Sequence, residues 1–313
     1  PWDGPERLPP PNWTAQKAAD FLRRRDPTRP FFLWASFVAP HPPYLPPAPY
    51  FAMYSGRDLR PPVIGAWASR PDPGQNTADG FTAALSEAQT RRMQAGYYGS
   101  ITHLDHQIGR LLRELKDEGV LQDTVILFTS DHGEMLGDHY MLRKSQGYQG
   151  SVHVPLVLYD PGGHLGLPQG RRCEALAELR DVMPTLLAAA GLPVPATVDG
   201  MDLAACARGA PGRGWLHGEH TAQQGPPHSM QYILMDGFKY LWYSHTGAEQ
   251  LFDLQRDPGE CRDLASDPAF ARQKQAMRAR LVQALAGRPE GYSDGAGLKT
   301  GCPPLTVLPR TTI

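Results

Sequence analysis

The residues with the clearest capacity for chemistry lie in one segment, residues 129–139, which reads TSDHGEMLGDH. It follows an apolar run at residues 124–129 that has the composition of a buried strand. In open α/β sheets, ligands bind at the carboxyl ends of strands. There, Asp131 and His132 would offer a carboxylate oxygen and an imidazole nitrogen to one divalent cation, and Gly133 would let the chain turn away. Because so short a motif also occurs by chance, a plain turn at a strand end is the alternative.

Three apolar runs are expected to form buried strands that position this segment: residues 31–37, 124–129 and 154–159. Between the first two, apolar residues recur at steps of three and four over residues 86–118, which predicts a long amphipathic helix. Shorter helices are expected over residues 175–190 and after Asn12 or Thr14, either of which could cap the first turn. The stretch from about residue 45 to 85 is expected to be irregular.

The C-terminal part has a different pattern. Short strands are predicted over residues 229–235, 239–244 and 249–254, because Asp-Gly and Thr-Gly turns separate them. A closing helix is predicted over residues 268–286. The Gly- and Pro-rich loop at residues 207–228 precedes them. We therefore expect an α/β body over residues 1–206 and a small α+β subdomain with antiparallel strands over residues 207–313.

Composition excludes several classes of function. The 313 residues carry 31 Lys and Arg against 32 Asp and Glu, so bulk charge favours neither nucleic acid nor a membrane surface as a partner. There is no apolar run of about 18 residues that would predict a transmembrane helix. The four cysteines form no Cys-x-x-Cys pair, so a zinc knuckle is not supported.

Several further motifs follow one another along nearly the whole chain in an order that resembles the sulfatase family of the alkaline phosphatase superfamily. The run from Phe31 to Tyr44, with APHPPY at its end, is similar to the strand that leads to an active-site histidine in that family. The segments LDHQIGRLL at 104–112, VHVPL at 152–156 and QLFDL with DPGE at 250–260 are similar to family motifs as well. His153 stands where the family usually has arginine. The resemblance implies a mixed sheet with helices on both faces.

The resemblance also implies roles for individual residues. Asp131 and His132 would bind the divalent metal, His41 would contact the sulfate and help to protonate the leaving oxygen, and Lys144 would bind the sulfate and leaving-group oxygens. These roles make chemical sense, since rupture of a sulfate ester places negative charge on the bridging oxygen. The structural alternatives are a loop histidine held by prolines for His41 and a solvated basic loop for Lys144. His139 and His220 are weaker candidates for substrate contact, and a structural role is an equal alternative for His139.

The family's nucleophile is a formylglycine made from a cysteine or serine in a C/S-x-P-S/A-x-R context. None of the four cysteines has that context, and the paired acidic metal ligands of the family's first strand are also absent. We therefore expect the formylglycine in a missing N-terminal part, and an isolated chain that is inactive. The cofactor expected from the family is Ca²⁺, with Mg²⁺ or Mn²⁺ as alternatives because imidazole is an unusual ligand for so hard a cation.

These observations predict a sulfuric-ester hydrolase whose substrate is a small aryl or sugar sulfate. The alternatives are a phosphonate monoester hydrolase or phosphodiesterase of the same superfamily, and a catalytically dead, anion-binding fragment. A chain without the leading strands would expose a central sheet edge, so we expect it to fold poorly, or to pair with its missing half. A homo-oligomer is a further possibility. Either a cytoplasmic or a periplasmic or secreted location is compatible, since any signal would lie upstream of Pro1.

Overall fold

The computed structural model describes residues 1–5, 9–72, 81–221 and 228–305, and its contacts divide the chain into two compact units. The chain passes between the units several times, so neither is one continuous stretch. The predicted boundary between residues 206 and 207 stays a prediction. Unit 1 comprises Pro1–Pro62, Leu85–Leu127 and Val157–Gly166, and unit 2 comprises Val63–Ala84, Phe128–Leu156 and Leu167–Ile313.

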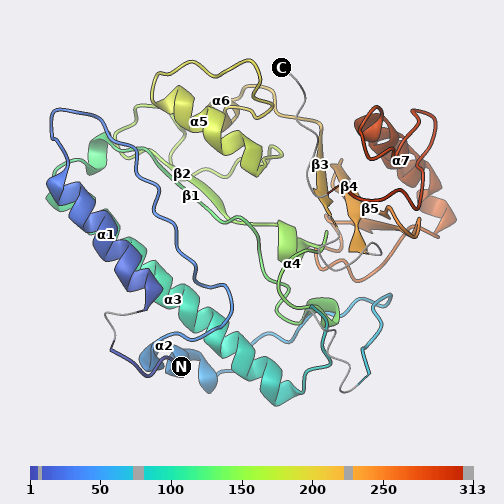
Figure 1. Ribbon diagram of the computed structural model, residues 1–313, viewed down its shortest axis with the longest axis horizontal. Helices are drawn as coiled ribbons and strands as arrows, with labels where there is room; N and C mark the ends of the chain where they lie inside the picture. The colour runs from blue at the N-terminus through green and yellow to red at the C-terminus, as the bar shows by residue number, and fades with distance from the viewer. Residues whose placement is uncertain (6–8, 73–80, 222–227, 306–313) are drawn as a thin grey trace. The chain divides into compact units, whose positions relative to one another are not determined.

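Unit 1 is built on the long helix α3 (Glu87–Asp117), which confirms the helix predicted over residues 86–118. Ser86 and Gln89 form a reciprocal capping box at its start, so its first amide groups are satisfied locally. Helix α1 (Pro10–Arg24) runs alongside α3, and α2 (Ala48–Ser55) packs against it as well (Figure 1).

Two features of these helices differ from expectation. Helix α1 begins at Pro10, since proline tolerates the first helical turn, and Asn12 bonds to His103 of α3 rather than capping α1. Helix α2 lies in the stretch expected to be irregular, where its eight residues are too few to show a clear period. Contact with α3 stabilises it, because Gly99 lets the backbone of Tyr50 approach closely.

The prediction of a strand buried on both faces over residues 31–37 was wrong. The segment has no strand pairing among the described residues, and its side chains alternate between partly buried and exposed. Phe31 packs edge-on against Phe21 of α1, at 6.0 Å between ring centroids, but Phe32 and Trp34 are 69% and 76% exposed. An apolar run of this kind needs cover on both faces, and α1 supplies it on one.

The other two apolar runs do form strands. β1 (Ile126–Thr129) and β2 (Leu156–Tyr159) pair in a two-stranded sheet, as Figure 1 shows. Between them lie the 3₁₀ turn η2 (Asp138–Tyr140) and the single helical turn α4 (Gln149–Val152). The helix predicted over residues 175–190 is present as η3 (Leu179–Asp181) and α5 (Val182–Ala189), and a short α6 (Leu203–Ala207) follows.

The C-terminal strands form a four-stranded antiparallel sheet in the order β3-β4-β5-β6, which confirms the predicted meander. Asp236 and Gly237, both with positive φ, make the two-residue turn between β4 and β5. An additional strand, β3, lies within the expected loop and pairs with β4 at one edge of the sheet. The strands are β3 (Trp215–His220), β4 (Met230–Met235), β5 (Phe238–Tyr243) and β6 (Glu249–Asp253).

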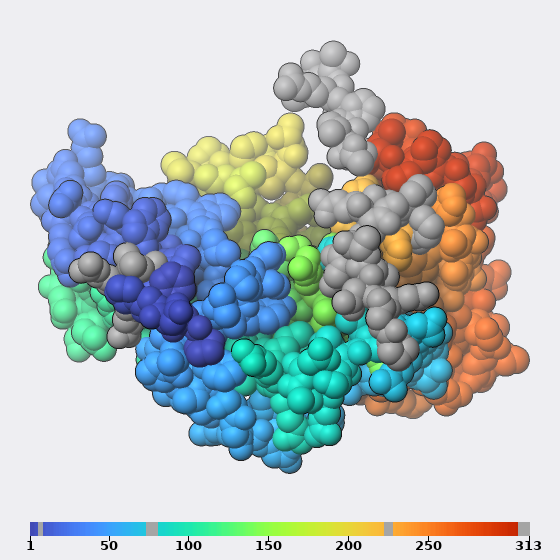
Figure 2. All heavy atoms as spheres, turned by 60° about the horizontal axis from the view of Figure 1, so that its bottom comes forward, coloured from blue at the N-terminus to red at the C-terminus, as the bar shows by residue number. Residues whose placement is uncertain are grey.

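The largest core of unit 2 lies between this sheet and the closing helix α7 (Ala271–Leu285). Tyr240, Trp242 and Leu251 from the sheet pack with Met277 and Leu281 from the helix, all of them almost completely buried. In the space-filling view of Figure 2, the orange and red atoms of this part form one continuous mass. Burial of this apolar area stabilises the packing of α7 on the sheet.

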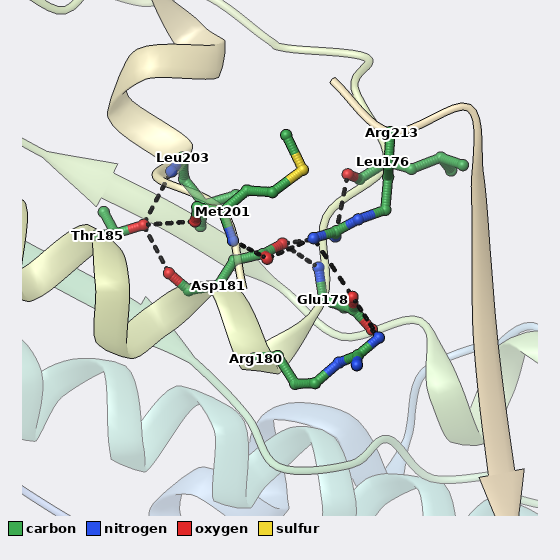
Figure 3. A network of polar contacts seen from close by, with 8 residues as sticks. All are labelled: Leu176, Glu178, Arg180, Asp181, Thr185, Met201, Leu203 and Arg213. Atoms are coloured by element: carbon green, nitrogen blue, oxygen red, sulfur yellow. Dashed lines mark hydrogen bonds and ion pairs between the residues drawn. The ribbon is translucent and has the colours of Figure 1, made fainter. Parts of the chain in front are cut away.

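A buried ion pair holds the α5 region of the same unit together (Figure 3). The carboxylate of Asp181 accepts hydrogen bonds from Arg213, at 2.5 and 2.7 Å, and from the backbone amide groups of Glu178 and Met201. Thr185 bonds to the carbonyl oxygen of Asp181 and accepts from the amide group of Leu203. Asp181 is fully buried, and despite the cost of burial these bonds lower its pKa.

These elements agree with the predicted α/β body and antiparallel C-terminal sheet. Of the helices described, none combines the length and apolar character that crossing a bilayer requires. Helix α3, at 31 residues, is long enough but carries charged residues throughout.

Candidate active site

Asp131 and His132 lie on the turn that directly follows β1, as predicted. The side chain of Asp131 is 86% exposed, that of His132 is 26% exposed, and Asp131 Oδ2 lies 3.8 Å from His132 Nε2. His132 Nδ1 is 2.8 Å from the carbonyl oxygen of Gly133, so in the neutral ring Nδ1 carries the proton and donates it. The lone pair is therefore on Nε2, which faces the carboxylate.

Gly133 is required at this turn for steric reasons. An added Cβ would overlap the carbonyl oxygen of Gly150 at the start of α4. The amide group of Gly133 donates to the carbonyl oxygen of Ser151 over 2.7 Å. Helix α4 is thus the direct support of the turn that presents Asp131 and His132.

The loop between this turn and α4 has an unusual backbone. Seven non-glycine residues in the described chain have positive φ, and five of them lie here: Leu136, His139, Tyr140, Arg143 and Ser145. Such conformations cost free energy for residues with a Cβ, and they cluster at functional sites. Two of them flank Lys144, so the strain is concentrated around a predicted sulfate-binding residue.

Hydrogen bonds between its two ends hold this loop closed. Glu134 accepts from the amide groups of Leu136 and Arg143, and the amide group of Met135 donates to the carbonyl oxygen of Arg143 over 2.8 Å. Residue 144 is therefore held close to the segment that continues from Gly133. Lys144 itself is half-buried.

The structure brings together only some of the predicted residues. Asp131, His132 and Lys144 belong to unit 2, where the loop and α4 connect them. His41 belongs to unit 1, on a proline-rich turn with cis bonds before Pro40 and Pro43. Its ring is exposed, and its Nδ1 lies 2.9 Å from the carbonyl oxygen of Pro42.

His139 is buried inside unit 2, with 4% of its surface exposed. Its Nδ1 accepts from the amide group of Gly65 over 3.0 Å, and its ring packs on Trp67 at 4.7 Å between centroids. A further hydrogen bond reaches the backbone of Gly259. Burial lowers the pKa of His139 from 6.5 to about 4, so the ring is neutral at pH 7. Both ring nitrogens are thus engaged with backbone, which favours a positioning role over substrate contact.

His220 is the last residue of β3, opposite Met230. Burial, and then the nearby His228, lower its pKa. Its Nε2 has no hydrogen-bond partner among the residues that the structure describes. Its proposed contact with substrate stays a prediction.

Sequence reasoning missed two residues that support this region. Lys239 on β5 is fully buried and forms a 2.7 Å ion pair with Glu260, which is also buried. The available signal was a single charge inside the apolar run Phe238-Lys239-Tyr240-Leu241-Trp242, since a charge at such a position needs a partner. The partner lies in the DPGE motif, 21 residues further along the chain.

The donor set fits a divalent metal in part. Asp131 offers a carboxylate oxygen, and the Nε2 lone pair of His132 faces it, so the two side chains can supply an oxygen and a nitrogen ligand to one metal ion. Across the described ranges, no group of three or more His, Cys, Asp or Glu side chains converges in a metal-binding arrangement. Asp131 and His132 would therefore supply two ligands of a larger set.

Replacement of Gly133 by alanine tests how tightly α4 supports the turn. We expect Gly133→Ala to lower the free energy of unfolding by about 1–3 kcal/mol, because the new methyl group overlaps the Gly150 carbonyl oxygen. Urea denaturation measures this. Gly109→Ala, in open space on α3, is the control and should stabilise by up to about 1 kcal/mol. Equal effects at the two positions would contradict the steric argument.

His139 predicts a dependence of stability on pH. Between its ordinary pKa of 6.5 and its folded value of about 4, the unfolded chain binds a proton that the folded chain does not. Stability should therefore fall as the pH drops through this window, by up to about 3 kcal/mol from this residue. Urea denaturation at pH 7 and pH 4.5 should show a smaller loss in His139→Gln than in the parent. The exposed His245→Gln is the control, and an undiminished loss in His139→Gln would contradict the assignment.

Comparison with known proteins gives consistent results. The family model "Sulfatase" matches residues 12–192, more than half of the chain, and the model "N-sulphoglucosamine sulphohydrolase, C-terminal" matches residues 137–286. An arylsulfatase of Clostridium perfringens is 43% identical over 311 residues, which cover 98% of this chain and 64% of the relative. The chain thus spans less than two thirds of the length of that protein.

Two solved structures extend the likeness to the fold. A phosphonate monoester hydrolase of Agrobacterium radiobacter is 29% identical, with a TM-score of 0.73 over 87% of this chain and 60% of its own. A protein solved with its substrate D-glucosamine-2-N,6-O-disulfate has a TM-score of 0.75 over 88% of this chain and 69% of its own, at 19% identity. The fold, the order of the motifs and the extent of the family match lead to one assignment: the chain belongs to the sulfatase family.

Proposed function

We propose that this chain carries the metal- and sulfate-binding part of a sulfuric-ester hydrolase. The observation that carries the proposal is the turn after β1, where the tautomer of His132 directs the Nε2 lone pair toward the carboxylate of Asp131. Family membership and the 43% identity to an arylsulfatase support an ester of sulfuric acid as the substrate. The reaction would convert the ester and water into an alcohol and hydrogen sulfate.

Asp131 and His132 would hold the divalent metal, which when bound would neutralise charge on the sulfate oxygens. Ca²⁺ is the proposed ion by resemblance to the family, with Mg²⁺ or Mn²⁺ as alternatives, because His132 would contribute a nitrogen ligand. The carboxylate of Asp131 is exposed, so a metal ion could reach it from solvent.

Lys144 would place its ammonium group against the sulfate and the bridging oxygen, where negative charge develops as the ester bond breaks. The positive φ of its neighbours Arg143 and Ser145 supports such a role, since strained backbone of this kind clusters at functional sites. For His41, the proposed role as sulfate contact and proton donor rests on the resemblance alone. The proposed substrate contact of His220 rests on its position only.

The nucleophile needs a separate source. None of the four cysteines has the context for conversion to formylglycine, so we propose that a formylglycine outside residues 1–313 serves the reaction. An aryl sulfate is the proposed substrate class, on the identity to the arylsulfatase, and a sugar sulfate is the alternative. Homo-oligomerisation stays a prediction.

A second candidate activity has an observation in its favour. The phosphonate monoester hydrolase of similar fold is 29% identical to this chain, and a cation with a lysine suits phosphoryl oxygens as well as sulfuryl oxygens. The third reading, a catalytically dead fragment that binds anions, is an outcome of the tests below.

Calorimetric titration of the chain with CaCl₂ tests the proposed metal site. We expect heat of binding, and at least about tenfold weaker binding in Asp131→Asn, because the amide is a neutral and poorer ligand than the carboxylate. The exposed Asp123→Asn is the matched control and should bind as the parent does. Absence of heat with Ca²⁺, Mg²⁺ and Mn²⁺ alike would contradict the proposal.

Turnover tests the reaction class in a polypeptide that carries a formylglycine segment together with residues 1–313. We expect a higher kcat/KM for an aryl sulfate than for an aryl phosphodiester. Lys144→Ala should lower kcat/KM for the sulfate by about 10²–10³, since it removes a charge from the developing oxyanion. Arg143→Gln, its neighbour, is the control. Preference for the phosphodiester would select the second candidate, and no turnover of either would favour the dead fragment.

A further inference from the structure

The buried ion pair of Lys239 and Glu260 does more than join two elements of the C-terminal subdomain. The Lys239 ammonium group also donates to the carbonyl oxygen of Gly147 over 2.8 Å. The second carboxylate oxygen of Glu260 accepts from the amide group of Gln149 over 2.7 Å. Both charged groups therefore bind the backbone of residues 147–149, which lead from Lys144 into α4.

Stability of the subdomain alone does not account for this arrangement. Taking both charges out of water costs free energy, and apolar residues of the same volume often serve a core equally well. Lys239 is 0% exposed and Glu260 is 1% exposed, so both charges lose nearly all of their hydration. What apolar side chains could not supply is a donor for one backbone carbonyl group and an acceptor for one backbone amide group two residues apart.

Residues 147–149 pack closely on the sheet, and neighbouring side chains bond to them and to Glu260. At Gly147, an added Cβ would lie 2.6 Å from Leu241 Cδ2 on β5, so a side chain there would displace the buried Leu241. The buried Tyr148 donates to Gln250 over 2.6 Å. Glu260 itself has φ of +54°, and the indole group of Trp67 donates to its carbonyl oxygen over 2.7 Å. The carboxylate is thus presented by a backbone that is itself held in place.

The anchored segment supports both parts of the candidate site. On one side, Lys144 is only three residues from Gly147. On the other, Ser151 of α4 accepts the amide hydrogen of Gly133, next to His132. A continuous set of hydrogen bonds therefore runs from Glu260 through α4 to the turn of the proposed metal ligands.

We propose that Lys239 and Glu260 are positioning residues, which fix residues 144–152 and, through α4, the Asp131–His132–Gly133 turn. This inference rests on the proposed function, because the two segments carry the residues proposed to bind metal and sulfate. The ordering of the two segments is a separate property that can be measured without substrate or metal. The alternative is that the ion pair stabilises only the C-terminal sheet.

Amide hydrogen exchange, followed by mass spectrometry on the 313-residue chain, tests the inference. In Glu260→Ala, exchange of peptides covering 131–135 and 144–152 should become at least about fivefold faster, because Gln149 N–H and Lys239 lose their acceptor. Glu260→Gln keeps an amide oxygen that can accept from Gln149, so it should restore part of the protection. If Glu260→Ala does not fold, Glu260→Gln against the parent decides, with faster exchange expected in the same two peptides.

Asp181→Ala is the matched control, since Asp181 is an equally buried carboxylate paired with an arginine in the same unit. It should leave exchange of 131–135 and 144–152 within about twofold of the parent, because its bonds lie in the α5 region (Figure 3). Unchanged exchange in the Glu260 variants, or an equal rise in Asp181→Ala, would overturn the inference.

A calcium titration of the same variants separates the inference from the proposed function. With the metal bound as proposed, Glu260→Gln should weaken Ca²⁺ affinity by about tenfold, and unchanged affinity would overturn the link between the ion pair and the site. If the parent chain binds no Ca²⁺, the proposed function fails. The exchange experiment then still decides whether Lys239 and Glu260 order the two segments.

Discussion

The docking of residues 147–149 onto the antiparallel sheet is the constraint on which the rest of the candidate site depends. Two buried charges hold the backbone of this segment, and at Gly147 an added Cβ would lie 2.6 Å from the side chain of Leu241 on β5. Helix α4 begins there, and it carries the carbonyl group that holds Gly133. The turn after β1 and the antiparallel sheet are far apart in the sequence, and residues 147–149 with α4 connect them.

The strained loop between Gly133 and α4 follows from the same constraint. Positive φ at Arg143 and Ser145 is unfavourable for each residue alone and persists only where the surroundings determine it. Here the surroundings are the hydrogen bonds of Glu134 and Met135 at one end of the loop, and the hydrogen bond from Lys239 to Gly147 at the other. His139 fixes the middle of the loop, and its depressed pKa is the electrostatic consequence of a ring buried in protein.

Much of the local structure could be predicted, because it depends on neighbours in sequence. The period of α3, the Asp236-Gly237 hairpin and the strand before Asp131 are local properties, and the structure confirms them. The exposed faces of Phe32 and Trp34 could not be foreseen, because an apolar run says that cover is needed but not whether it is present. Strand β3 was missed because its sequence, WLHGEH, has a glycine and only two apolar residues, so its own residues carry a weak strand signal.

For the site, the sequence by itself determined the residue types and their order: an acid and a histidine at the end of a strand, a glycine at the turn, and a lysine twelve residues beyond the histidine. These identities were enough to point to the family. Only the tertiary structure decided the tautomer of His132, the burial of His139 and the pairing of Lys239 with Glu260. The physical reason is that pKa values, tautomers and ion pairs depend on which groups come within a few ångströms in space, and distance along the chain does not determine that.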